Sequence, residues 1–297
     1  TIEPRAELKR AGLAGADLRG ADLTEATLWL ASLQYACLAQ ANLEGANSKG
    51  ARAEHADLQG SRLTGASLER ANFTGANLSA ADLTRATLSF KTYFIGANLR
   101  GATLRSVSGQ SNFMQADLTG ADLQDADIGG SYFVDAVLQG CDLRRASLNW
   151  AKFLGANLQE ANFEQANLEW ANFGPSDRGN SVVASIGVDL DQDCESEEVP
   201  EGADLRRANL SRTCLKDSSF LGANLEGTNF EGAVAESAGF PEANLQRANL
   251  CDIDLTKANL TKADLREANL EGAILQGAQF GGARLSGVNL SGLNMRS

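Results

Sequence analysis

The sequence predicts an all-β chain wound into a parallel β-helix of square cross-section. Three observations carry this prediction: a repeat of five residues runs through most of the 297-residue chain, a small residue stands two places before the large apolar centre of each repeat, and phenylalanines recur at every fourth repeat. A period of five fits neither the period of about 3.6 of an α-helix nor the alternation of a plain strand. Each repeat is therefore expected to be a short extended piece followed by a corner.

The repeat reads as a small residue, then Asp or Asn, then Leu or Phe, then two mostly polar residues. Its centres recur over three stretches, Leu8 to Leu88, Phe113 to Phe173 and Leu205 to Met295. In an extended piece the small residue and the centre point the same way, toward the axis, while Asp and Asn suit a turn. Coils stacked about 4.8 Å apart would hydrogen-bond through their backbones, and about 13 coils are expected.

The phenylalanines indicate how many repeats close one coil. Most of them fall four or eight repeats apart, so one coil should take four repeats and one face should carry a buried column of rings. The members of this predicted core column are Phe73, Phe113, Phe133, Phe153, Phe173, Phe220, Phe240 and Phe280.

Two interruptions divide the chain into a first part (1–173), an insert (174–202) and a second part (203–297). The Phe column resumes in phase after the insert, so we expect one continuous rod with the insert looped out at a corner. Within 89–112 the frame slips by one residue and then returns, with the extra residue near Lys91 and the missing one before Phe113. This slip predicts bulges around Tyr93–Ile95 and Val107–Gln110.

The insert carries most of the net charge of −12. It holds eight acidic residues and one Arg, so the remainder of the chain is close to balanced at −5. Asp189, Asp191, Asp193 and Glu195 resemble the start of a calcium loop. However, Cys194 stands where such a loop needs Gly and Pro200 where it needs Glu, so a solvated acidic loop is the preferred interpretation and no metal site is predicted.

Other chemistry finds little support in the residues. The five cysteines have no C-x-x-C spacing, His55 is the one histidine, and the recurring Asp and Asn occupy a structural place in the repeat. We therefore predict no enzyme, no catalytic residue and no cofactor. No run of 18 apolar residues and no signal-peptide pattern occurs, so no membrane partner is expected. Ser48 and Ala53 are poor centres and predict a thin core at their coil.

Two regions are candidates for binding a partner. Trp150 and Trp170 both stand two places after a centre and are four repeats apart, so they should stack outside one corner in adjacent coils. In the insert the candidates are Asp189, Asp191, Glu197 and Glu198. The C-terminal end of such a rod would expose an apolar core, so a homodimer through that end is expected unless a cap covers it.

The tandem A-(D/N)-L-x-x pattern resembles the pentapeptide-repeat family over roughly residues 6–173 and 203–297. The resemblance implies a right-handed quadrilateral β-helix and, together with the absence of catalytic motifs, a non-catalytic scaffold. Such a scaffold would bind a protein partner through the rod faces and the acidic loop, with no direct binding of nucleic acid.

The resemblance also implies an alternative function. Some family members mimic duplex DNA and bind type II topoisomerase (gyrase), giving quinolone protection or gyrase inhibition. The nearly balanced charge of this rod argues against such mimicry. The family is abundant in cyanobacteria, so a bacterial origin is expected. A cytoplasmic location is expected, with an exported or lumenal form as the alternative because the chain starts at Thr1 without Met.

Overall fold

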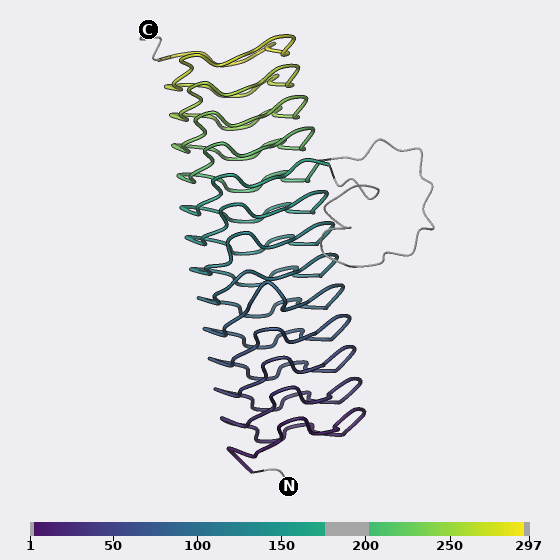
Figure 1. Ribbon diagram of the computed structural model, residues 1–297. Coiled ribbons are helices and arrows are strands. Elements are labelled where there is room, and N and C mark those ends of the chain that lie inside the picture. Colours follow the sequence, from purple (N-terminus) through teal and green to yellow (C-terminus); the bar gives the residue numbers. More distant parts are fainter. Residues whose placement is uncertain (1–2, 176–201, 294–297) are drawn as a thin grey trace, which may run out of the picture.

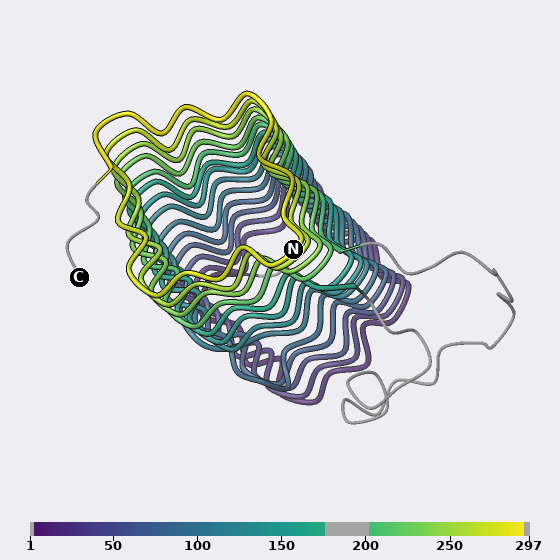
Figure 2. The ribbon, with the colours of Figure 1, turned by 90° about the horizontal axis from the view of Figure 1, so that it is seen from above.

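The computed structural model describes residues 3–175 and 202–293, which wind into a rod with the two chain ends at opposite ends of its axis (Figure 1). The described residues contain no helix and no extended strand, only isolated parallel bridges separated by turns. Seen from above, successive coils superimpose on a four-sided outline (Figure 2). The expected all-β architecture is confirmed.

Four ladders of parallel bridges hold the coils together. Each ladder usually joins a residue to its counterpart four repeats later, and the ladders begin with Glu7–Thr27, Gly12–Ser32, Asp17–Cys37 and Asp22–Asn42. We call the corresponding sides of the rod faces A, B, C and D in that order, and we name each corner by the two faces that it joins. Each repeat contributes only one bridged residue because the chain turns immediately afterwards.

The turn explains why the five-residue pattern is needed. The carbonyl of Leu8 accepts a hydrogen bond from the N–H of Ala11 at 3.0 Å, and the second turn residue, Arg10, has φ of 57°. A positive φ at this place is what a type II turn requires. The N–H of Arg10 in turn bonds the carbonyl of Trp29 in the next coil at 2.9 Å.

Where an Asp or Asn stands before the centre, its side chain satisfies the remaining donor of the turn in most coils. The Oδ1 of Asn42, for example, accepts from the N–H of Glu44 at 3.2 Å, and the Oδ1 of Asp117 from that of Thr119 at 2.9 Å. Since an unpaired backbone donor is costly, this side chain stabilises the corner. The recurring carboxylates therefore have a structural use.

The axis of the rod is filled by the repeat centres and the small residues. The rings of Phe73 to Phe240 stack on face B with centroids 4.6–5.2 Å apart, and Phe94 from the slipped stretch fills the position between Phe73 and Phe113. These rings are buried. Phe280, expected in the same core, is only partly buried, because it lies in the last described coil and no further described coil covers it.

The frame slip has a definite position on corner A/B. Asn72 bridges to Tyr93, one place further along the chain than in a regular coil, and Tyr93 bridges to Asn112, one place short of the regular position. The extra residue therefore lies in a wider turn at 89–92, which confirms its expected position near Lys91. The bulge expected around Tyr93–Ile95 does not form there, because from Tyr93 onward the coil is regular again. The hydroxyl of Thr92 closes that turn, since it accepts from the N–H of Ser89 at 2.9 Å and donates to the carbonyl of Leu68 at 3.0 Å.

The missing residue falls between Ser108 and Asn112, where the chain bends at Gly109 with φ of 100°. A Cβ at Gly109 would overlap the carbonyl oxygen of Leu88, so only glycine fits this close approach. This bend lies within the expected range Val107–Gln110.

The coils before and after the insert lie directly on each other. Bridges join Asn157 to Asp204 and Asn172 to Ser219, and the rings of Phe173 and Phe220 stack at 4.6 Å. The N–H of Ala203 bonds the carbonyl of Phe173 at 2.8 Å, the same bond that closes a regular turn. The break in the described residues, between 175 and 202, therefore falls at corner B/C, where a regular coil has its turn.

Candidate partner-binding surface

Trp150 and Trp170 form a stacked pair on the outside of corner A/B. Their ring centroids lie 5.0 Å apart with planes 8° from parallel, and the residues are 52% and 42% exposed. Each occupies the second turn residue of its coil, with φ of 64° and 61°. The coil spacing therefore stacks the two indoles, as their separation by four repeats indicates, but leaves much of their surface to solvent.

The widened turn places a further aromatic side chain on this corner. Phe90 is 61% exposed, and the ammonium of Lys91 lies 5.4 Å from its ring centroid. The exposure of Phe90 was not expected. It could have been predicted, because Phe90 stands neither at a regular centre nor at a slipped one and so has no place on the axis.

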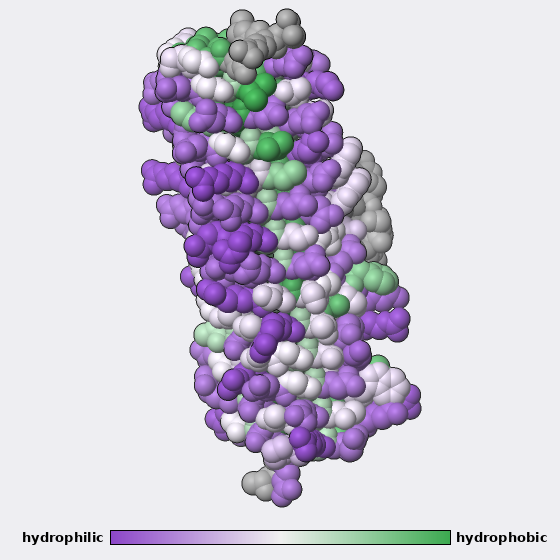
Figure 3. Space-filling model, turned by 90° about the vertical axis from the view of Figure 1, so that its left-hand side faces the viewer, coloured by the Kyte–Doolittle hydropathy of each residue, from purple (hydrophilic) through white to green (hydrophobic). Residues whose placement is uncertain are grey.

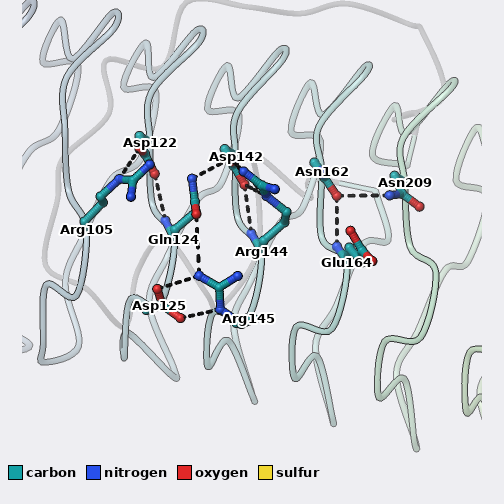
Figure 4. A network of polar contacts seen from close by, with 10 residues as sticks. All are labelled: Arg105, Asp122, Gln124, Asp125, Asp142, Arg144, Arg145, Asn162, Glu164 and Asn209. Carbon is teal, nitrogen blue, oxygen red and sulfur yellow. Dashed lines mark hydrogen bonds and ion pairs between the residues drawn. The ribbon is translucent and has the colours of Figure 1, made fainter.

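Corner D/A is covered instead by a lattice of polar contacts (Figure 4). Arg145 holds Asp125 of the preceding coil through two hydrogen bonds of 2.6 and 2.7 Å, and Arg144 pairs with Asp142 of its own coil at 2.6 Å. The hydrogen bond from Arg145 lowers the pKa of the Asp125 carboxyl below its usual value. Because these charges pair with one another, the network has a structural role and is not a candidate binding site. Each exposed pair contributes little to stability.

The arginines of corner C/D are also paired. A shallow cavity there is lined by Glu160, Arg206, Arg207, Glu226 and Arg247 among others. Arg247 lies 3.6 Å from Glu226, Arg207 lies 3.9 Å from Glu160, and Arg206 binds Asp204 at 2.7 Å. Mixed and largely compensated charge does not select a ligand of either sign.

A second apolar column lies outside the axis on corner B/C. Met114, Val134 and Leu154 are first turn residues of three successive coils, yet they are only 1%, 3% and 8% exposed, with Ile95 and Tyr132 packed against them. This column was not expected from the repeat pattern. It could have been predicted from the apolar residue that directly follows the centre in four successive coils before the insert.

The acidic candidates Asp189, Asp191, Asp193, Glu195, Glu197 and Glu198 lie outside the described residues. Within the described ranges, no group of three or more His, Cys, Asp or Glu side chains is placed to hold a metal ion. His55 is exposed and stacks on Tyr35 with ring centroids 5.3 Å apart. Burial raises the pKa of the Cys141 thiol to about 12, so this inward cysteine is unreactive.

The end of the described rod nearest the C-terminus exposes apolar side chains. Leu285 and Leu290 are 44% and 49% exposed. In Figure 3 the hydrophobic colour gathers toward this end, while hydrophilic residues cover most of the face in view. In the described part of the chain, no helix has the length and apolar character needed to span a bilayer.

Comparisons with known proteins agree with this architecture. The family model described as pentapeptide repeats matches in eight copies, over residues 6–47, 54–89, 109–133, 131–169, 218–256, 240–272 and 253–292. Among curated proteins, none matches the chain.

Solved structures that resemble the chain include three of the same repeat type. HetL, a pentapeptide repeat protein involved in heterocyst differentiation regulation from the cyanobacterium Nostoc sp. strain PCC 7120, is 29% identical, with 80% of this chain and 89% of that one covered and a TM-score of 0.37. Trypsin-treated QnrB1, a plasmid-mediated fluoroquinolone resistance protein, is 18% identical (80% and 87% covered, TM-score 0.30). Rfr23 from the cyanobacterium Cyanothece 51142 is 25% identical (48% and 88% covered, TM-score 0.24).

The family model covers well over half of the chain, and its repeats coincide with the bridged coils. The chain therefore belongs to the pentapeptide-repeat family, whose members fold as right-handed quadrilateral β-helices.

Proposed function

We propose that the chain is a non-catalytic scaffold that binds a protein partner, with the Trp150/Trp170 pair at corner A/B as a principal contact. The observation that supports this proposal is the exposure of two stacked indoles that the coil does not need for its core. Trp is enriched in protein interfaces relative to the rest of the surface and among the residues that dominate binding energy.

The test compares the proteins captured by the wild-type chain, by a Trp150→Ala/Trp170→Ala double variant and by Tyr35→Ala. Tyr35 is a matched control, since it is 69% exposed and also stacks on a ring of the next coil, but on corner B/C. We expect at least one captured protein to lose about tenfold or more in binding to the double variant alone. If every captured protein binds all three chains equally, corner A/B is not the contact.

We propose the acidic insert as a second contact region, on its charge alone. Its net −7 stands against −5 for all other residues together, so a basic surface would be drawn to this one corner of the rod. Deleting residues 176–200 should weaken the same interaction and reduce its dependence on salt. Unchanged binding by the deleted chain would remove the insert from the proposal.

A type II topoisomerase is the second candidate partner, and the family resemblance is what favours it. The near balance of charge along the rod speaks against mimicry of duplex DNA, whose charge is dense and uniformly negative. A gyrase supercoiling assay decides between the two candidates. Protection or inhibition at micromolar protein would favour the topoisomerase, and the absence of any effect would remove it.

We also propose that two copies associate through the end that carries Leu285 and Leu290, because burying these leucines against a second copy would remove apolar surface from water. Analytical ultracentrifugation of the wild type and of Leu290→Glu tests this. The wild type should sediment as a dimer and the variant as a monomer.

A further inference from the structure

A shallow notch lies beside the Trp pair where the frame slip removes one residue from corner A/B. Gln110, Asp127, Gly130, Asn149 and Trp150 contribute to its lining. The column of second turn residues runs from Gly130 to Trp150 to Trp170, and Trp170 covers one face of the Trp150 indole. Because Gly130 has no side chain, no residue of that column covers the other face.

Two groups around this free indole face are hydrogen-bond acceptors, while Asn149, whose Oδ1 already accepts from the hydroxyl of Ser147 at 3.2 Å, presents its amide N–H. Asp127 is exposed, and among the described residues its carboxylate makes no hydrogen bond and no ion pair. Most other aspartates of the ladders, such as Asp117, bind the N–H two places later in the chain. The Nε2 of Gln110 is used by the carbonyl of Gly130 at 2.7 Å, which anchors the amide and leaves its Oε1 without a partner in the described residues.

Among the described residues, no cationic side chain lines the notch. A negative group, an amide oxygen and an uncovered indole face together suit a flat cation. The guanidinium group of arginine is planar, stacks on aromatic faces and has five donors, whereas an ammonium is a compact point charge.

The same corner already holds a cation against a tryptophan elsewhere in the rod. The Nζ of Lys9 lies 4.4 Å and the Cζ of Arg10 5.3 Å from the ring centroid of Trp29 in the next coil. At Trp29 the preceding coil supplies the cation, whereas at Trp150 the preceding coil supplies Gly130. The chain therefore provides a cation for Trp29 and leaves Trp150 open to one from a partner.

We propose that the notch receives an arginine side chain of a protein partner, stacked on Trp150 and paired with Asp127. This inference rests on the proposed function of corner A/B and names the chemistry that the corner recognises. The partner would present this arginine from an exposed segment, with Trp170 and Phe90 of the same corner available for apolar contacts.

The test uses two peptides, acetyl-Gly-Arg-Gly-amide and the same peptide with citrulline, which keeps the flat shape of arginine but is neutral. The indole Nε1–H resonance of Trp150 is followed by NMR during each titration, with Trp29 as an internal control. We expect a saturable shift with the arginine peptide and binding about tenfold weaker with the citrulline peptide. Equal affinity for the two peptides, or no saturable shift, would overturn the proposal.

Two variants of the notch sharpen the test. Gly130→Gln places a side chain in the notch, in a backbone conformation that Gln115 and Gln165 already adopt in this rod, with φ of 55° and 62°. Because the Nε2 of Gln110 lies 3.2 Å from the place of the added Cβ, the Gln110 amide must also shift, so the variant changes two groups of the notch at once. It should abolish the shift, and Asp127→Asn should weaken peptide binding about fivefold. Gly140→Gln is the matched control, since Gly140 has φ of 65° on corner C/D and open space around it. Gly130→Gln that binds the peptide like wild type would overturn the proposal.

The capture experiment separates this inference from the proposed function. If the double Trp variant loses a partner while Gly130→Gln and Asp127→Asn retain it, corner A/B is a contact but the arginine notch is wrong. If the double Trp variant loses no partner, the proposed function fails, and with it the claim that the notch serves a protein partner.

Discussion

The rod carries two stacks of aromatic rings that have the same spacing but differ in position and in exposure to solvent. The rings of Phe133, Phe153 and Phe173 lie 4.9 Å apart on the axis and are fully buried, and those of Trp150 and Trp170 lie 5.0 Å apart on corner A/B and are about half exposed. The spacing is set in both cases by the hydrogen-bonded coils. Regular stacking by itself therefore does not distinguish a structural role from a binding role. The exposed fraction of the rings does, because it separates a core column from a candidate contact.

The largest expected effect comes from breaking the inner stack. Phe153→Ala should lower the free energy of unfolding by about 3–5 kcal/mol, because it leaves a cavity between two rings that cannot close. Phe153→Leu is the control and should cost less than about 1.5 kcal/mol, since leucine fills many centres of this rod. Urea denaturation with hydrogen exchange measures both. A Phe153→Ala chain as stable as wild type would contradict the view that this column holds the coils together.

Filling a poorly packed centre on another face of the axis should have the next largest effect. Ser48 stands at a centre between Leu28 and Leu68 of face A, is 3% exposed, and its hydroxyl has no hydrogen-bond partner among the described residues. Ser48→Leu should stabilise the chain by about 1–2 kcal/mol, because it buries apolar surface and removes the orphaned oxygen. Ser48→Ala removes the oxygen without adding volume and should gain less. Destabilisation by Ser48→Leu would show that this coil is too narrow for a leucine.

The outer carboxylates should make the rod sensitive to acid. The hydrogen bond from the Arg266 side chain lowers the pKa of the Asp264 carboxyl from its usual value of 3.8, and hydrogen bonds to Asp17 lower its pKa to about 2. The folded chain therefore keeps these groups ionised where the unfolded chain is protonated. Their stabilisation is complete above about pH 4 and is lost as the pH falls toward about 2.

Asp264→Asn tests this dependence. It should cost about 1 kcal/mol or less at neutral pH, and the difference from wild type should shrink at acid pH, as protonation removes the charge of Asp264 in the folded chain as well. Asp127→Asn is the control, since its carboxylate has no partner among the described residues and its removal should leave stability at neutral pH unchanged. Thermal denaturation at both pH values provides the readout. A cost of Asp264→Asn that persists in acid would mean that packing, not charge, is lost.

The smallest effect on stability is expected from the outer stack. Trp150→Ala should change the free energy of unfolding by about 0.5 kcal/mol, because half of the ring surface stays in water in the folded chain. The measurement is the same urea titration used for Phe153→Ala. A loss comparable to that of Phe153→Ala would place the Trp pair among the structural elements and remove the reason to regard it as a contact.

Much of the fold follows from the pattern of the chain. The four-sided coil, the buried Phe column and the stacking of Trp150 on Trp170 all depend on one period, and a tightly packed axis admits one large side chain per repeat. The charge division between insert and rod is likewise a property of the residues alone. Repeats that contact only their neighbours make such patterns additive and therefore readable.

The candidate site was only half predictable. The Trp pair and the extra residue near Lys91 were expected, but the exposure of Phe90 was not, because the hydroxyl of Thr92, and not the spacing of centres, closes the widened turn and sets its shape. Nothing in the sequence pattern marks Asp127 as different from the other ladder aspartates.

Four features follow from the order of the amino acids alone: the period, the number of sides, the contents of the axis and the pair of tryptophans on one corner. The position of the notch, in contrast, could be read only from the folded chain. It forms where Gly109 bends against Leu88 and where Gly130 leaves the face of Trp150 open. The interior is predictable because the same kind of residue stacks on its counterpart in every coil. The outer surface is less predictable, because its shape depends on which side chains meet across neighbouring coils.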